Sequence, residues 1–167
     1  SLDITAATLD AAGIPHPKLF HGQSLFKNAK PRTEIFTARD RCDMTVDRIR
    51  AVRDSRYKLI RNFYPNRSYA QFNEYIKTSY PTLTVLHDLH QQGKLTELQA
   101  RWLAPTRPEY ELYDHQSDPH EVNNLAGQPA HRKAFERLKK RLDEWIEATN
   151  DQGRTPETAE TIAREED

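Results

Sequence analysis

The sequence is poor in the residues that form covalent cross-links and metal sites. It has one cysteine, Cys42, among 167 residues, which excludes an internal disulfide and any multi-cysteine zinc site. It has only five glycines, and they form no glycine-rich loop for phosphate groups. The aspartates at positions 40, 43 and 47 lack the glycine turn of a calcium loop. We therefore expect no metal ion in this chain.

The chain also lacks a net charge and a long hydrophobic run. It contains 25 basic and 25 acidic residues, so no overall field attracts nucleic acid or a membrane. No apolar run is long enough to span a bilayer, and no signal peptide is recognisable. The charges are nevertheless uneven, because residues 28–67 hold 11 lysines and arginines against 5 acidic residues, whereas residues 143–167 hold 2 against 9. The basic block is the one electrostatic indication of an anionic ligand.

Alternating apolar residues predict a small antiparallel sheet. Strands are expected at 33–38, 48–53, 57–63 and 110–114, with a tight turn between the second and third. A long helix is predicted over 131–146, because apolar residues recur there at helical spacing, and it should lie across the sheet. The fold class is therefore α+β, a four-stranded antiparallel sheet packed by a long C-terminal helix.

Three further segments surround this sheet. A first helix is expected to begin with Asp3 as its N-cap and to end at Gly13. Residues 64–104 form an insertion with predicted helices over 82–92 and 96–103. Residues 151–167 are acidic and almost free of large apolar side chains, so they are predicted to be a tail.

A motif between residues 112 and 125 carries several local signals. Its residues are Leu112, Tyr113, Asp114, Asp118, Pro119, Glu121, Asn124 and Leu125. The first three end the last strand. Asp118 and Pro119 are expected to start a capped helical turn, with Glu121 favouring its positive end. Asn124 suits a left-handed helix end, which would return Leu125 to the core.

The ordered motif resembles the pattern that closes the sulfatases of the alkaline-phosphatase-like superfamily, just before their last helix. Asp3-Ile4 through Ala12-Gly13, followed by Gly22-x-Ser24-Leu25, is similar to the end of sulfatase catalytic domains, although that family usually has proline where this chain has Ala7. Residues 50–62 resemble a sulfatase hairpin, and the insertion at 64–104 resembles that of the heparan N-sulfatase, or sulfamidase, branch.

The resemblance implies a division of the chain and a parent enzyme. Residues 1–27 would end the catalytic domain, residues 28–150 would form the C-terminal subdomain, and residues 151–167 the tail. The parent would hydrolyse sulfate esters or sulfamates, on a sulfated glycan, in the periplasm or outside the cell. It would use calcium and a formylglycine made from the cysteine of a Cys-x-Pro/Ser-x-Arg signature. Cys42 lacks that context, so the catalytic residues are expected in a missing N-terminal domain.

That division leaves this chain without catalytic residues or cofactors of its own. The chain opens with Ser1 and not with methionine, which we expect to reflect a cut or processed start. Apolar residues make up only 36% of the chain, and such a lean composition indicates that part of its surface is covered by something outside it. We therefore expect the isolated chain to be inactive, with the missing catalytic domain and a sulfated sugar as its partners.

Four residues are candidates for substrate binding: Arg39, Arg41, Asp43 and Arg48. Guanidinium groups bind sulfate oxygens in a bidentate way, and a carboxylate accepts hydrogen bonds from sugar hydroxyls. These residues, from a loop at 39–43 and the strand after it, would line the rim of a neighbouring pocket. The alternative is that they form surface ion pairs on an exposed sheet edge.

Two other functions remain open at this point. The chain could be a stand-alone module that binds polyanions through its basic hairpin or contacts a partner protein through the helical insertion. It could also belong to a phosphodiesterase of the same superfamily, because the closing motif does not depend on the leaving group.

Overall fold

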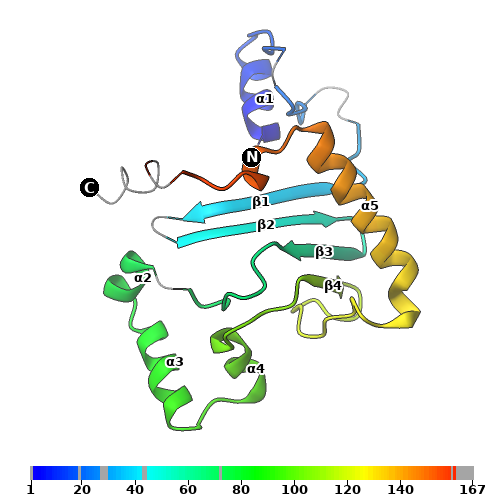
Figure 1. Cartoon of the computed structure of the whole chain (residues 1–167). Coiled ribbons are helices and arrows are strands. Elements are labelled where there is room, and N and C mark those ends of the chain that lie inside the picture. Colours follow the sequence, from blue (N-terminus) through cyan, green and yellow to red (C-terminus); the bar gives the residue numbers. More distant parts are fainter. Residues whose placement is uncertain are drawn as a thin grey trace. The chain divides into compact units, whose positions relative to one another are not determined.

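The computed structural model describes residues 2–18, 20–26, 30–42, 45–71, 73–158 and 160. The chain divides into two compact units, residues 1–33 and residues 34–167, and Figure 1 gives the order of their elements. None of the helices in these described ranges is long and apolar enough to cross a bilayer.

The first unit contains helix α1 (Leu2–Ala11). The helix begins one residue before the predicted cap, so Asp3 lies in its first turn. There Asp3 accepts hydrogen bonds from the backbone of Gln23 at 2.8 Å and from the guanidinium of Arg32. The expectation for Asp3 as N-cap was wrong because its carboxylate binds these two distant partners. Gly13 follows the helix with a φ of 71°, which suits glycine.

The second unit is built on a four-stranded antiparallel sheet. Its strands β1 (Ile35–Cys42), β2 (Thr45–Arg53), β3 (Tyr57–Asn62) and β4 (Tyr110–Asp114) lie in sequence order. The predicted sheet is confirmed. The first strand, however, continues through the predicted loop to Cys42, because Arg39 and Arg41 pair with Ile49 and Val46 on either side of a bulge.

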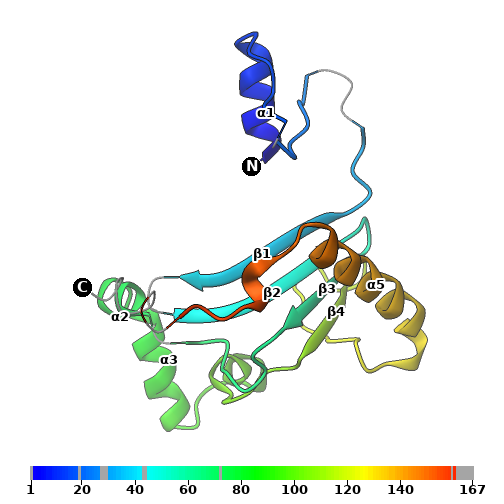
Figure 2. The same ribbon diagram turned by 45° about the horizontal axis from the view of Figure 1, so that its top comes forward.

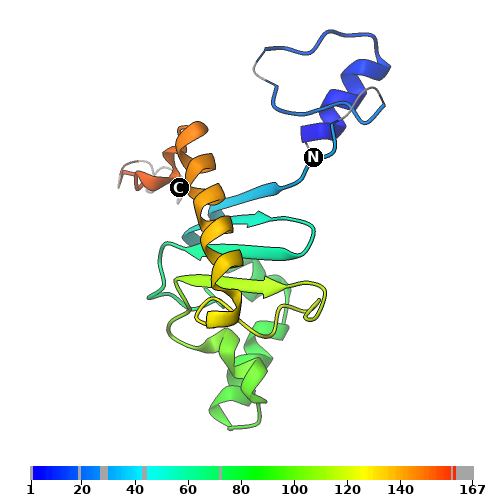
Figure 3. The ribbon, with the colours of Figure 1, turned by 90° about the vertical axis from the view of Figure 1, so that its right-hand side faces the viewer.

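One face of the sheet packs against helix α5 (Arg132–Ala148), which crosses the strands as predicted (Figure 3). Val52, Leu59 and Leu112 stand in register on neighbouring strands, and they bury against Leu138, Leu142 and Ile146 of the helix. Phe36 stacks on Trp145 with ring centroids 5.1 Å apart. This is the hydrophobic core of the second unit, so the position of α5 on the sheet is fixed by apolar burial.

The insertion between β3 and β4 contains α2 (Glu74–Ser79), α3 (Thr82–Gln91), α4 (Glu97–Ala100) and the 3-10 turn η1 (Arg101–Leu103). Figure 1 shows these helices together, away from α5. Asn73 caps α2, and Thr96 with Gln99 forms a capping box on α4. None of the described residues in these helices is buried, so core burial does not define where they begin, and α2 and α4 begin at capping residues.

The remaining helical turns flank α5. The 3-10 turn η2 (Pro129–His131) precedes it, and η3 (Gln152–Arg154) follows it. Figure 2 shows the chain leaving α5 and running along the face of β1 and β2. The first residues of the predicted acidic tail therefore lie on the sheet.

Candidate functional site

The sequence-predicted binding residues lie on two neighbouring strands. Arg39 and Arg41 belong to β1, which is an edge strand, and Arg48 belongs to β2. Arg39 is exposed, whereas the side chain of Arg41 is only 10% exposed and its Nε lies 3.2 Å from Glu157. Asp43 lies outside the described residues. The arginines are therefore strand residues in different surroundings and not members of one loop.

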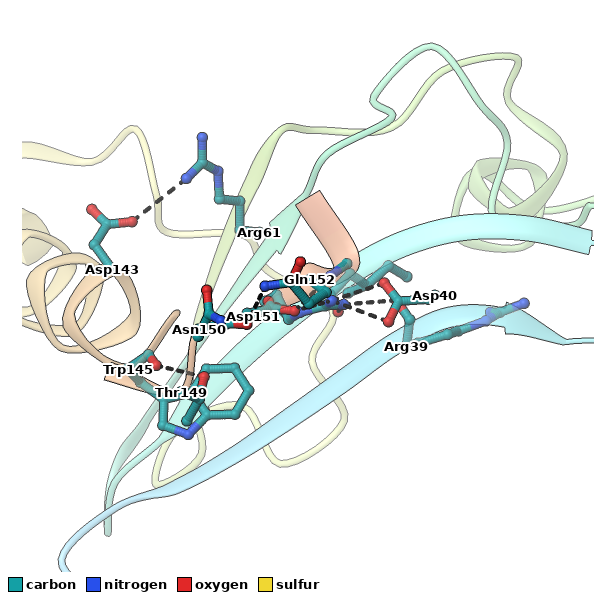
Figure 4. Close-up of polar contacts among 12 residues, drawn as sticks. Arg39, Asp40, Arg61, Asp143, Trp145, Thr149, Asn150, Asp151 and Gln152 are labelled. Carbon is teal, nitrogen blue, oxygen red and sulfur yellow. Dashed lines mark hydrogen bonds and ion pairs between the residues drawn. The ribbon is translucent and has the colours of Figure 1, made fainter. Parts of the chain in front are cut away.

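The centre of this region is Arg50, a buried arginine that sequence reasoning did not single out. Its side chain is 1% exposed, and Nε and Nη2 donate to the two carboxylate oxygens of Asp151 at 2.6 and 2.9 Å. Nη2 also donates to Asp40 at 2.8 Å, and Nη1 donates to the backbone carbonyls of Arg39 and Ile49. Figure 4 labels the two aspartates, Asp40 from β1 and Asp151 from the segment after α5. We call Arg50, Asp40 and Asp151 the arginine clamp.

The ion pair between Arg50 and Asp151 shifts the pKa of both side chains. The hydrogen bond from Arg50 holds the pKa of Asp151 below its usual range, and the bond to Asp151 raises the pKa of Arg50. Gly153 closes the clamp from the side of η3, because a Cβ there would lie 1.8 Å from Nη2 of Arg50. A missing side chain at position 153 thus lets the backbone approach the buried guanidinium.

A pocket of about 300 Å³ opens beside the clamp, between the sheet and the C-terminal half of α5. We call it the arginine pocket. Its lining consists of three arginines, two acidic residues and two apolar residues: Arg48, Arg61, Arg154, Asp143, Glu147, Phe63 and Ile146. Arg39 and Arg41 are not among these residues. Of the predicted binding residues that the structure describes, only Arg48 reaches this pocket.

Arg48 is the electrostatically unusual member of the pocket. Its guanidinium carbon lies 3.8 Å from the centre of the Phe63 ring, in the geometry of a cation–π contact. Burial lowers the pKa of Arg48, and the nearby charge of Arg50 lowers it further. The charges of Asp151 and Asp40 act on Arg48 from nearby, but in the part of the chain that the structure describes its Nε is buried and lacks an acceptor.

The opposite face of the sheet carries a buried polar network. Asp47 of β2 is paired with Arg107, whose Nη1 donates to Oδ2 at 2.8 Å, and it also accepts a hydrogen bond from Gln71. Glu111 of β4 accepts from Asn62 at 2.6 Å and from the hydroxyl of Tyr113 at 2.5 Å. These contacts fasten the two ends of the insertion to the sheet, and their role is structural.

The closing motif folds in part as predicted. Leu112 and Tyr113 are buried in β4, and Asp114 is paired with Arg56, whose hydrogen bond lowers the pKa of that carboxyl. Asp118 does cap the following backbone, since it accepts from Val122 and Asn123. That backbone is a single hydrogen-bonded turn, closed by the bond from the N–H of Glu121 to the carbonyl of Asp118 at 3.3 Å, and the described residues directly after it form no helix.

Two motif residues depart from their predicted roles. The left-handed residue is Glu121, with a φ of 55°, and its carboxylate binds Lys58 at 2.9 Å. Asn124 instead pairs with β4: its Oδ1 accepts from the backbone N–H of Leu112, and its Nδ2 donates to the carbonyl of Tyr110. The prediction for Asn124 was wrong because its amide satisfies the free edge of the strand. Leu125 does pack against the core, as predicted.

The described residues do not fit a formylglycine or a calcium ion. Cys42 ends β1 as an exposed free thiol, and the residues after it are not those of the signature. No group of three histidine, cysteine, aspartate or glutamate side chains among the described residues is arranged to hold a metal ion. No catalytic step can be assigned to this chain through either group.

No protein-family model matches the chain, but three curated relatives do. One of them, an ulvan-active sulfatase of Formosa agariphila, is 38% identical over 160 residues, which cover 94% of this chain and 26% of the relative. Another, N-sulphoglucosamine sulphohydrolase of Homo sapiens, is 28% identical over 168 residues, which cover 90% and 32%. The chain thus spans about a quarter to a third of the length of the relatives it matches. The predicted resemblance to the sulfatases is confirmed.

Solved structures share the fold. A 2-O GAG sulfatase aligns with a TM-score of 0.60 at 22% identity, over 93% of this chain and 26% of that one. A protein solved in complex with its substrate D-glucosamine-2-N,6-O-disulfate aligns with a TM-score of 0.56 at 20% identity, over 92% and 25%. At this identity the likeness concerns the fold alone.

Proposed function

We propose that this chain, which is homologous to the sulfatases over about a quarter to a third of their length, is the C-terminal subdomain of a sulfatase. The parent hydrolyses sulfate esters or sulfamates on a sulfated glycan. The observation that carries the proposal is the 38% identity to an ulvan-active sulfatase across 94% of the chain. The relative named N-sulphoglucosamine sulphohydrolase supports a sulfamate as one of the two linkages.

In this proposal the chain is a scaffold and the missing N-terminal domain is its partner. That domain supplies the formylglycine nucleophile and the calcium ion. The absence of a fitting cysteine signature in the sequence, and of a metal-binding group among the described residues, supports this division of labour. The periplasmic or secreted location of the parent is part of the same proposal and is supported by the resemblance alone.

We also propose that Arg39, Arg41 and Asp43 contribute to the rim of the substrate pocket. The exposure of Arg39 on an edge strand supports this role, because an exposed guanidinium is available to bind a sulfate group in a bidentate way. Arg48, the fourth predicted residue, would reach the substrate only through the arginine pocket.

The test uses the full-length protein, including whatever is encoded ahead of Ser1. Sulfate release is measured from N-sulfated and from 6-O-sulfated glucosamine, with bis(4-nitrophenyl) phosphate as the phosphodiester. We expect release from at least one sulfated sugar and a much lower rate on the phosphodiester. Faster turnover of the phosphodiester would contradict the proposal and would show that the parent is a phosphodiesterase.

The rim is tested in the same protein with Arg39→Ala, Arg41→Ala and Asp43→Ala. A residue at the rim should lower kcat/KM on the sulfated sugar about tenfold or more, as for a lost hydrogen bond to a charged group. Arg53→Ala, at the exposed end of β2, is the matched control and should leave kcat/KM unchanged. If all three variants behave like the control, these residues belong to the surface of the sheet edge.

A further inference from the structure

Two arginine side chains contact the ring of Phe63. The guanidinium carbons of Arg48 and Arg61 lie 3.8 and 4.3 Å from the centre of its ring. Each contact is attractive, because the face of an aromatic ring is negative. Both guanidinium groups are positively charged, so they also repel each other. An anion beside both groups would relieve this repulsion.

Two hydrogen-bond donors of the pocket also lack acceptors in the described part of the chain. Among the described residues, Nε of Arg48 and Nε of Arg61 are both buried without a hydrogen-bond partner. Buried donors of this kind are rare in folded proteins, since leaving them unpaired costs free energy. An oxyanion has several acceptor atoms and would satisfy both donors.

The described acidic residues around the pocket pair with Arg61 only weakly and do not pair with Arg48. Asp143 divides its carboxylate between two cations: Oδ2 lies 2.6 Å from Lys139, and Oδ1 lies 3.5 Å from Nη1 of Arg61. Glu109 lies 4.0 Å from Arg61. Glu147 is bound to Arg154 at 2.8 Å. Arg48 has no carboxylate partner among the described residues.

The pocket is also open and large enough for a ligand. The side chains of Arg154 and Glu147 at its mouth are 45% and 69% exposed, whereas Ile146 at its base belongs to the core. Figure 4 shows Arg61 facing Asp143 across this region. A volume of about 300 Å³ is at the lower end of the range for small-molecule sites, and it suits one charged group with part of a sugar ring.

We propose that the arginine pocket binds a single oxyanion group of an acidic sugar, with Arg48 and Arg61 as the binding cations and Phe63 as the surface that positions them. A sulfate and a carboxylate share this chemistry. The inference goes beyond the proposed function, because it concerns the chain by itself. Failure of the full-length protein to release sulfate would leave it standing.

The experiment titrates the 167-residue chain with sodium sulfate and follows the arginine Nε–Hε signals by NMR, with sodium chloride at equal ionic strength as the reference. We expect saturable shifts of the Arg48 and Arg61 signals with sulfate only. Arg48→Gln should weaken sulfate binding at least tenfold. The matched control is Arg53→Gln, an exposed arginine on the same strand, and it should bind as the original chain does.

Further titrations identify the source of the oxyanion. Glucose 6-sulfate, glucuronate and glucose are compared by the same signals. If either acidic sugar binds more tightly than glucose, the result supports the proposed site. The sugar that binds more tightly identifies the oxyanion as a sulfate or a carboxylate. A second variant, Phe63→Leu, keeps both arginines and should still weaken binding, with melting curves confirming that each variant folds. The proposal is overturned if chloride shifts the signals as sulfate does, or if Arg48→Gln binds sulfate as tightly as Arg53→Gln does. It is also overturned if glucose binds as tightly as the two acidic sugars.

Discussion

Arg50 and Asp151 are 101 residues apart in the sequence, and their side chains form a bidentate ion pair with distances of 2.6 and 2.9 Å. The pair joins the second strand of the sheet to the segment that follows the last helix. It is almost completely removed from solvent on the arginine side. The end of the chain is therefore fastened to the sheet beyond α5, next to the arginine pocket.

Removing the charge of Asp151 should destabilise the fold more than removing that of Asp40. Asp151→Asn should lower the free energy of unfolding by about 1.5–3 kcal/mol, the range for a hydrogen bond to a charged group. Asp40 contacts the same guanidinium but is 51% exposed, so Asp40→Asn should cost less than about 1 kcal/mol. Urea unfolding of both variants gives the comparison. An equal or larger loss for Asp40→Asn would contradict the assignment of Asp151 as the main partner.

The same pair predicts how stability depends on pH. The folded-state pKa of Asp151 lies below its usual range because of Arg50, so the pair stabilises the fold at pH values above the ordinary aspartate pKa of about 3.9. This contribution is lost as the pH falls below about 4. The stability difference between the original chain and Asp151→Asn should therefore be constant near neutral pH and shrink in acid. A difference that stays the same down to about pH 2 would exclude this linkage.

Gly153 should not tolerate a side chain. A Cβ at this position would lie 1.8 Å from Nη2 of Arg50 and 2.6 Å from Oδ1 of Asp40, and Arg50 is held by several hydrogen bonds. Gly153→Ala should cost about 1–3 kcal/mol, as for overpacking at a buried site. At Gly127 an added methyl group would meet no heavy atom of the described residues within 4 Å, so Gly127→Ala is the control and should change stability by less than about 0.5 kcal/mol. Thermal melting of the two variants should separate them clearly.

Asn124 should stabilise the free edge of β4. Its amide forms three hydrogen bonds, with Tyr110, Leu112 and Ala126. Asn124→Ala should lower stability by about 1–3 kcal/mol, because it leaves strand backbone groups unpaired. The neighbouring Asn123 has an exposed side chain, and Asn123→Ala should have little effect. Hydrogen exchange of the Leu112 amide checks the mechanism, since it should quicken in the first variant only.

The architecture could be predicted because its signals are local and periodic. The helix at 132–148 has apolar residues on one face, and the strands at 57–62 and 110–114 alternate so that Leu59 and Leu112 meet in register. Periodicity does not report which charged residues are buried. The extension of β1 to Cys42 was missed because its residues are charged and have a weak strand preference, which their backbone pairing with β2 outweighs.

The polar contacts could not be predicted, because each depends on residues far apart in the sequence. Arg50 appeared as one of many arginines on an alternating strand, and Asp151 and Gly153 as part of an acidic tail. The pairing of Arg107 with Asp47 likewise depends on how the insertion returns to the sheet. Arg48 was predicted as a binding residue from its charge alone, whereas Phe63, Arg61 and Arg154 became recognisable only in the folded pocket.

The most direct test of the account is sulfate release from N-sulfated and from 6-O-sulfated glucosamine by two proteins measured side by side. One is the 167-residue chain, and the other is the same chain preceded by the residues encoded ahead of Ser1. The account predicts release by the longer protein only, with loss of that activity when its signature cysteine is changed to alanine. Release of sulfate by the 167-residue chain alone would contradict it.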